Sequence, residues 1–136
     1  MEALKAFAAG FISTLVFHQA LMTFMYEATL WPTRAYPMAA TSPLQVPAVI
    51  SLAFWGGLWG IALWLAILGM SGPAYWAAAA VLGALGPTLV ALFIVFPLKG
   101  KPVAAGGDRK IIIGALILNG TWGLGTALLL RLLTKT

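Results

Sequence analysis

The only histidine of the chain, His18, lies inside a long apolar segment, where an ionisable side chain is costly to place. Its neighbour Gln19 is also polar, and Glu27 follows nine residues after the histidine. Nine residues of α-helix turn through about 900°, so Glu27 is expected on the face opposite His18. The two residues therefore do not predict an acid–base pair within one helix, and Glu27 is better explained as an interfacial carboxylate.

Two further polar side chains are expected at the depth of His18. Counted inward at 1.5 Å per residue from the span ends that share one membrane face, His18 lies about 10–12 Å deep, Asn119 about 12 Å and Thr88 about 13 Å. Gln19 and Thr121 are next to two of them in the sequence. We therefore predict a polar intramembrane site made of His18, Gln19, Thr88, Asn119 and Thr121.

Three kinds of chemistry remain open for this polar site. Its side chains could hydrogen-bond across helices and fix which faces meet, each bond contributing about 0.6 kcal/mol on average. They could line a path for a substrate or for protons, because imidazole titrates near pH 6.5 when unperturbed. His18, Met22 and Met25 also share a helical face, and haem iron or Cu(I) accepts histidine and methionine as ligands.

The sequence lacks the residues that other kinds of catalytic site would need. A hydrolytic triad needs a nucleophile beside a base, and no serine stands in a recognisable nucleophile motif. Cysteine is absent, and one histidine with three acidic residues falls short of a hydrolytic metal site. The segment GGDRK lacks the spacing of a phosphate-binding loop. We predict no enzyme activity, no catalytic residue, no metal site and no cofactor.

The elements that must position the polar site are membrane spans. The 136 residues are 62% hydrophobic and only 8% charged, which leaves too few charges to cover a water-facing surface. Four apolar runs, at about 4–26, 47–70, 75–97 and 111–132, are long enough to cross a hydrocarbon core of about 30 Å. The sequence thus predicts an all-α integral membrane protein, with one transmembrane domain over 1–136 whose four helices form an up-down bundle. The first run exceeds the length of a signal peptide and is expected to stay uncleaved.

The connections and the basic residues define two faces. The first connection, with four prolines, is expected to lie along the membrane surface, and the second, SGPA, predicts an antiparallel hairpin of the second and third spans. The face of the first and third loops carries Arg34, Lys99, Lys101, Arg109 and Lys110, and the other carries Lys5, Arg131 and Lys135. This difference is too small to orient the chain. Nor do the scattered cations form the basic stripe of a nucleic-acid-binding protein. Around the third loop, they predict a lipid-headgroup or anion site at Lys99, Lys101, Arg109 and Lys110.

Glycines mark where the helices should touch, because small residues let helix backbones approach closely in lipid. Packing is predicted at Gly56 and Gly60, which have GxxxG spacing, and at Gly120 and Gly123. The segment GGLWGIALWL (56–65) resembles NGTWGLGTALLL (119–130) at an offset of 63, and STLV (13–16) resembles PTLV (87–90) at an offset of 74. These matches suggest two copies of a helix–loop–helix unit in the same orientation.

The expected function is that of a non-enzymatic polytopic membrane protein. It would act through assembly in the lipid bilayer, either as a homo-oligomer or as a small subunit of a membrane complex. One alternative is a minimal oligomeric transporter or channel with the polar site at mid-bilayer, and another is a haem- or copper-binding membrane protein. Small size and richness in Ala, Gly and Leu favour the bacterial cytoplasmic membrane as its location.

Overall fold

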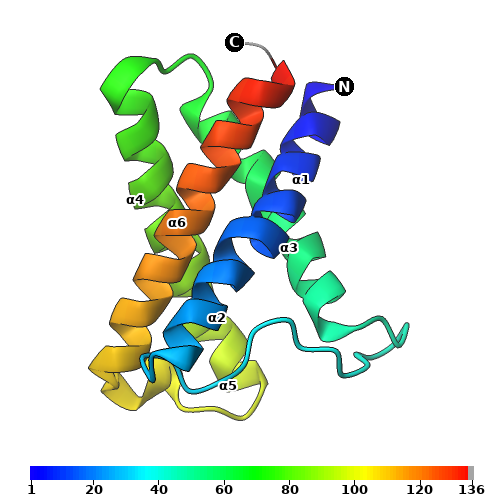
Figure 1. Ribbon diagram of the computed structural model, residues 1–136, viewed down its shortest axis with the longest axis vertical. Helices are drawn as coiled ribbons and strands as arrows, with labels where there is room; N and C mark the ends of the chain where they lie inside the picture. Colours follow the sequence, from blue (N-terminus) through cyan, green and yellow to red (C-terminus); the bar gives the residue numbers. More distant parts are fainter. Residues whose placement is uncertain (135–136) are drawn as a thin grey trace.

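The computed structural model describes residues 1–134 as a bundle of four long helical spans (Figure 1). The first span consists of α1 (Glu2–Ser13), the π-helical segment η1 (Thr14–His18) and α2 (Gln19–Glu27), and the second is α3 (Ala48–Ile67). The third consists of α4 (Gly72–Val90), the π-helical segment η2 (Ala91–Val95) and α5 (Phe96–Leu98). A short turn, η3 (Val103–Gly107), precedes the fourth span, α6 (Arg109–Thr134). All four spans are long and apolar enough to cross a membrane, which confirms the predicted fold class.

The bundle has two distinct ends (Figure 1). The terminal face holds the start of α1, the end of α6 and the turn between α3 and α4. The loop face holds the connections 28–47 and 99–108. All five basic residues predicted for the first and third loops therefore lie at the loop face. Of the three predicted for the terminal face, Lys135 lies outside the described residues.

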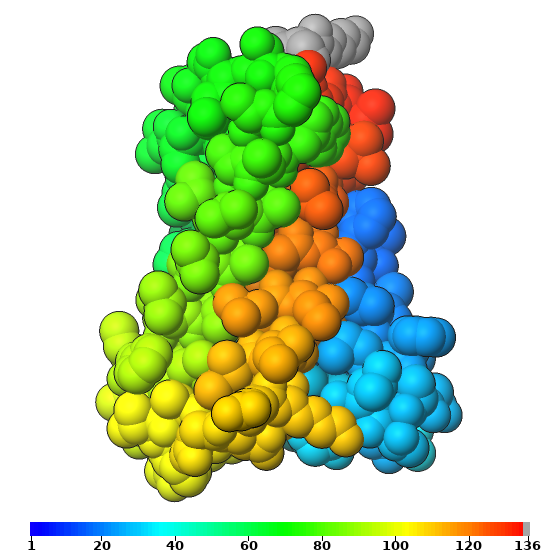
Figure 2. Space-filling model, turned by 90° about the vertical axis from the view of Figure 1, so that its left-hand side faces the viewer, coloured from blue at the N-terminus to red at the C-terminus, as the bar shows by residue number. Residues whose placement is uncertain are grey.

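The helices pack in the order α3, α1, α6, α4. Figure 2 shows α6 between α4 and the first span along one side of the molecule. The turn between α3 and α4 is as tight as expected, but these two helices make little contact along their length. The hairpin packing expected of them is slight because α3 packs mainly on α1 and α4 mainly on α6. A buried apolar cluster, which includes Ala6, Ile67 and Trp122, lies in the half of the bundle toward the terminal face.

The pairs α1–α3 and α4–α6 cross through small residues. A Cβ added to Gly60 would lie 2.6 Å from the Ala6 carbonyl oxygen and 2.9 Å from the Gly10 Cα. In the other pair, a Cβ added to Gly83 would lie 2.7 Å from the Gly123 Cα, and one on Gly123 would clash with the Ala79 carbonyl. Only glycine therefore fits at these three positions without a shift of one helix.

These contacts repeat at fixed offsets. Gly123 follows Gly60 by 63 positions, the offset of the second and fourth spans in the sequence comparison. The partners Ala79 and Gly83 follow Ala6 and Gly10 by 73 positions, one fewer than the STLV and PTLV match indicates. The two helix pairs thus cross through equivalent small residues, at offsets of 63 positions for the second and fourth spans and 73 for the first and third.

Two equivalent tryptophans link the pairs. Trp122 Nε1 donates a hydrogen bond of 3.1 Å to the Gly10 carbonyl in α1. Trp59, 63 positions earlier, lies against Gly86 in α4, where an added Cβ would be 3.1 Å from its ring. Each tryptophan therefore reaches the first helix of the other pair. The match is incomplete, because α1 and α6 pack closely whereas α3 and α4 do not.

The connection 28–47 fills the space between α2 and the start of α3. The first backbone N–H groups of α3 are capped by loop carbonyls, with Ala48 N to Ala39 O at 2.9 Å and Val49 N to Pro37 O at 2.8 Å. One residue earlier, the Tyr36 N–H donates to the Gln19 side chain inside the first span. Apart from this contact with the first span, most of the connection is exposed, in keeping with the surface loop expected from its prolines. Free N–H groups at a helix start need acceptors, and the loop backbone supplies them here.

Candidate functional site

The polar site begins at the π-helical segment of the first span. Here the Gln19 N–H donates to the carbonyl of Thr14, five residues back, where an α-helix would use four. Such wide turns are often found at functional sites. Gln19, directly after the wide turn, is fully buried, and His18 is half-buried. The third span has a wide turn of its own at η2, where the Phe96 N–H donates to the Ala91 carbonyl.

Polar side chains of three spans form one connected network. Asn119 Nδ2 donates to Thr88 Oγ1 at 2.9 Å, and the Thr88 hydroxyl donates onward to the Ala115 carbonyl at 3.4 Å. The Asn119 side chain is also a polar neighbour of the His18 imidazole. On the other side of the ring, Gln19 Nε2 lies 2.9 Å from His18 Nδ1. The network thus ties the first span to α4 and α6.

The network ends at the connection 28–47. Gln19 Oε1 accepts the Tyr36 N–H at 2.7 Å, and the Tyr36 hydroxyl donates to the Leu15 carbonyl within η1 at 2.7 Å. Because the amide oxygen of Gln19 is the acceptor, its nitrogen donates to His18 Nδ1. This assignment leaves the ring proton of a neutral His18 on Nε2.

Four of the five residues predicted for the polar site lie in this network, namely His18, Gln19, Thr88 and Asn119. Thr121 is half-buried and makes no side-chain hydrogen bond within residues 1–134. The observed span ends place the network about 12–15 Å inside the loop face, at 1.5 Å per helical residue. The four side chains therefore meet at one depth of the bilayer.

The atoms of the suggested haem or copper ligands already contact protein. Gln19 Nε2 contacts His18 Nδ1 and also lies 3.9 Å from Met22 Sδ. Met25 is buried, with its Cε near Gly114. Over the described part of the chain, no group of three or more His, Cys, Asp or Glu side chains is placed to hold a metal ion.

A second set of hydrogen bonds lies deeper, toward the terminal face, and was missed in the sequence. Ser13 Oγ donates to the Trp122 carbonyl at 2.8 Å, and Thr14 Oγ1 donates to the Gly10 carbonyl at 2.9 Å. The Trp122 indole donates to the same Gly10 carbonyl. The adjacent polar residues Ser13 and Thr14 in an apolar run were the available signal. These bonds join α1 to α6 where the two pairs meet.

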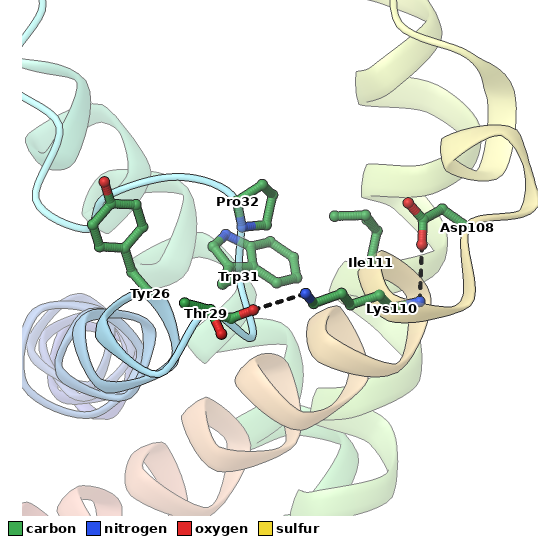
Figure 3. A pocket seen from close by; sticks show the side chains of 7 residues that line it. All are labelled: Tyr26, Thr29, Trp31, Pro32, Asp108, Lys110 and Ile111. Atoms are coloured by element: carbon green, nitrogen blue, oxygen red, sulfur yellow. Dashed lines mark hydrogen bonds between the residues drawn. The ribbon is translucent and has the colours of Figure 1, made fainter.

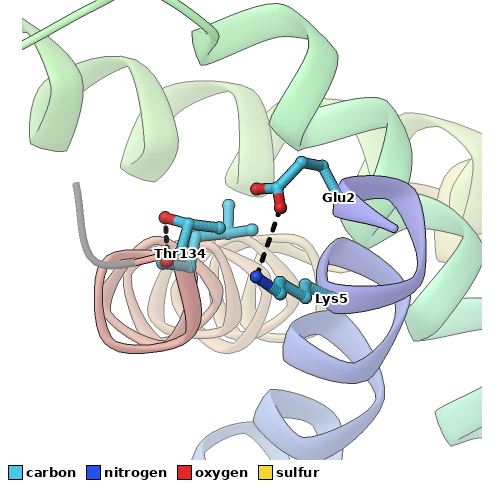
Figure 4. A network of polar contacts seen from close by, with 4 residues as sticks. Glu2, Lys5 and Thr134 are labelled. Carbon is cyan, nitrogen blue, oxygen red and sulfur yellow. Dashed lines mark hydrogen bonds and ion pairs between the residues drawn. The ribbon is translucent and has the colours of Figure 1, made fainter.

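The terminal face carries its own polar contacts. The Tyr75 hydroxyl donates to the Ala127 carbonyl at 2.6 Å, and the Arg131 guanidinium lies 4.1 Å above the Tyr75 ring. Glu2 and Lys5 form an ion pair of 3.2 Å on the first turns of α1 (Figure 4). The same view shows Thr134, whose hydroxyl donates to the Leu130 carbonyl at the end of α6. These contacts tie down helix ends and add no converging set of reactive groups.

Some of the residues predicted for helix packing and for anion binding lie at close crossings or at cavities, and others do not. Gly56, Gly60 and Gly123 lie at close helix crossings, whereas a Cβ on Gly120 would meet its nearest neighbour, Ala84 Cβ, at 3.5 Å, an ordinary contact. Among the four predicted anion ligands, Lys101 and Lys110 line cavities at the loop face. Lys99 and Arg109 line neither of these cavities.

Compared with family models, curated protein sequences and solved structures, the chain matches none of them. The network around His18 is closed by hydrogen bonds at both ends, and His18, Thr88 and Asn119 line neither loop-face cavity. This arrangement is suited to fixing which helix faces meet.

Proposed function

We propose that this protein is a non-enzymatic membrane protein that acts by assembling with a second copy of itself through the outer face of α3. The bacterial cytoplasmic membrane is the proposed location. The observation that carries the proposal is the indole of Trp55, a polar group within a membrane span that points away from its own bundle.

Trp55 is 58% exposed and lies seven residues into α3, about 10 Å from the start of the helix at 1.5 Å per residue. Its ring contacts Phe54, but its Nε1 has no hydrogen-bond acceptor among the described residues. A buried indole N–H usually finds an acceptor, and hydrocarbon offers none. A neighbouring protein helix would supply one.

The residues around Trp55 suit a helix–helix contact. A line of residues three or four apart runs along the outer face of α3, and we call it the α3 seam: Ser51, Trp55, Leu58, Ala62 and Ala66. Three of the five are small, which allows close approach of a second helix. Exposed Leu52, Phe54 and Leu65 flank this line on α3. The exposed face of α4 carries large apolar side chains that suit lipid, among them Val81, Leu82, Leu85 and Leu89.

A second copy of the chain is favoured by the seam itself. In a twofold dimer, the same surface of both copies forms the interface, so a residue of one α3 seam contacts residues of the other copy's α3 seam. Ser51 stands one helical turn from Trp55 and makes no side-chain hydrogen bond within the described chain, so its oxygen can accept the indole proton of an identical helix. The glycines at 56 and 60 do not contribute to this contact, because they are already covered by α1.

Disulfide cross-linking tests the proposal, since the chain contains no cysteine. We expect Ala62→Cys on the α3 seam to form a covalent dimer upon mild oxidation in native membranes. The matched control is Leu85→Cys on the exposed face of α4, which should stay monomeric. Adding Trp55→Phe to Ala62→Cys should reduce the dimer. Equal cross-linking of both cysteines, or capture of a different polypeptide by Ala62→Cys, would contradict self-association through α3.

A further inference from the structure

Two adjoining cavities lie at the loop face, on either side of Trp31 and Pro32. The larger, of about 410 Å³, is lined by Tyr26, Thr29, Trp31, Pro32, Asp108, Lys110 and Ile111 (Figure 3). The smaller, of about 240 Å³, shares Trp31, Pro32 and Ile111 with it and adds Lys101 and Phe96. We call the two together the Trp31 pocket. It is formed where the first loop folds against the third loop and the start of α6.

Trp31 is held firmly at the centre of this pocket. Its ring lies on Gly114 of α6, where an added Cβ would come within 2.6 Å of the ring. Its Nε1 donates to Thr33 Oγ1 at 3.1 Å. Tyr26 forms part of the wall from the last turn of α2. Tryptophan and tyrosine are enriched at the level of the lipid headgroups, and the loop face lies at that level.

The cations of the pocket lack acidic partners. Lys110 Nζ is fixed by a hydrogen bond of 2.7 Å to the Thr29 carbonyl, which holds the ammonium inside the larger cavity (Figure 3). Lys101 Nζ lies 5.2 Å from the centre of the Phe96 ring. Neither forms an ion pair, since the one ion pair of residues 1–134 is Glu2–Lys5 at the other end of the bundle. Each of the two adjoining cavities thus carries one positive charge without an acidic ion-pair partner among the described residues.

Asp108 is the acidic group of the pocket, and it already has a role. Its carboxylate accepts the backbone N–H of Lys110 at 3.0 Å and so caps the start of α6. The loop face as a whole carries five basic residues against two acidic ones, Glu27 and Asp108. The electrostatic balance therefore favours an anion, on the side of the pocket away from Asp108.

We propose that the Trp31 pocket binds the headgroup of an anionic phospholipid, with its phosphate at Lys110 in the larger cavity and its glycerol hydroxyls at Lys101 in the smaller one, across Trp31. Charge-assisted hydrogen bonds from the two ammonium groups, one to the phosphate and one to the glycerol oxygens, would hold the headgroup. The apolar walls and the position at the membrane boundary suit a lipid better than a free anion. The site is independent of the α3 seam, which lies on another helix.

Native mass spectrometry of the purified chain in detergent tests this site, with phosphatidylglycerol as the probe. A lost charge-assisted hydrogen bond should weaken binding about tenfold or more, so Lys101→Gln and Lys110→Gln should each show that loss. The matched controls are Lys99→Gln and Arg109→Gln, which remove the same charge from the same face outside the pocket. Because Lys110 also holds Thr29, Lys110→Arg keeps the charge and should retain most of the binding.

Other outcomes would overturn the proposal. General attraction to the basic face would weaken binding by about fivefold for each of the four Gln variants alike. Phosphatidylcholine bound as tightly as phosphatidylglycerol would remove the preference for an anionic headgroup. Displacement of phosphatidylglycerol by millimolar inorganic phosphate would assign the pocket to a free anion instead of a lipid.

Discussion

The hydrogen-bond network around His18 explains how polar side chains are tolerated inside the bundle. Each member has a partner on another element, and the network ends at the Ala115 carbonyl on one side and the Tyr36 backbone on the other. Asn119 is its central member because it contacts both Thr88 and His18. Unsatisfied polar groups are expensive in hydrocarbon, so the central member should matter more than an unpaired neighbour.

Replacing Asn119 tests this account at the residue scale. Asn119→Ala leaves Thr88 and His18 without their shared partner, and we expect a loss of about 0.6–1.7 kcal/mol in the free energy of unfolding. Thr121→Ala is the matched control, since Thr121 is half-buried on the same helix and makes no side-chain hydrogen bond among the described residues. Denaturation in mixed micelles measures both. A loss no larger for Asn119→Ala than for the control would mean that the network does not stabilise the fold.

The depth of these residues was predictable, whereas their connections were not. Counting 1.5 Å per residue from the span ends places His18, Thr88 and Asn119 at one level, because helices in a bilayer have a known rise and length. The link from Gln19 to Tyr36 depends on where the first loop meets the first span, and the wide turn at η1 has no periodic signal in the sequence. Thr121, two residues after Asn119 in the sequence, is not part of the network.

At the scale of the helices, the two crossings α1–α3 and α4–α6 are built alike. The spacing of Gly56 and Gly60 could be recognised in the sequence, because close crossings in lipid require small residues four apart. The helix that packs against these glycines could not be predicted, since a glycine indicates a close contact but not which helix makes it. The register of the first and third spans was also wrong by one residue, because a four-residue match is too short to fix it.

Substitution of the crossing glycines tests both pairs at once. Gly60→Ala and Gly123→Ala place a methyl group against the opposing backbone, and overpacking of this kind costs about 1–3 kcal/mol of stability. Gly120→Ala is the control, because its Cβ would meet Ala84 Cβ at 3.5 Å. Thermal unfolding in detergent should show similar losses for the first two variants and little change for the third. Similar melting temperatures for all three would contradict the observed register.

For the whole molecule, the difference between the two sides of the bundle is the main result. The first span and α6 are joined by the network and by Trp122, whereas α3 and α4 make little contact along their length. A large part of α3 therefore remains uncovered, including the α3 seam with Trp55. The prediction of four spans came from composition and length alone, but the uncovered face required the packing order of the helices.

The most direct test of the proposed assembly is a count of chains per particle in lipid. Single-molecule photobleaching of the labelled protein, diluted in bilayers, gives this count without detergent. We expect two chains per particle for the wild type and a shift toward one chain for Trp55→Phe, which keeps an apolar ring and removes the indole N–H. Trp76→Phe, near the start of α4, should leave the count at two. A wild-type protein that bleaches in one step, with Trp55→Phe unchanged from it, would contradict assembly through α3.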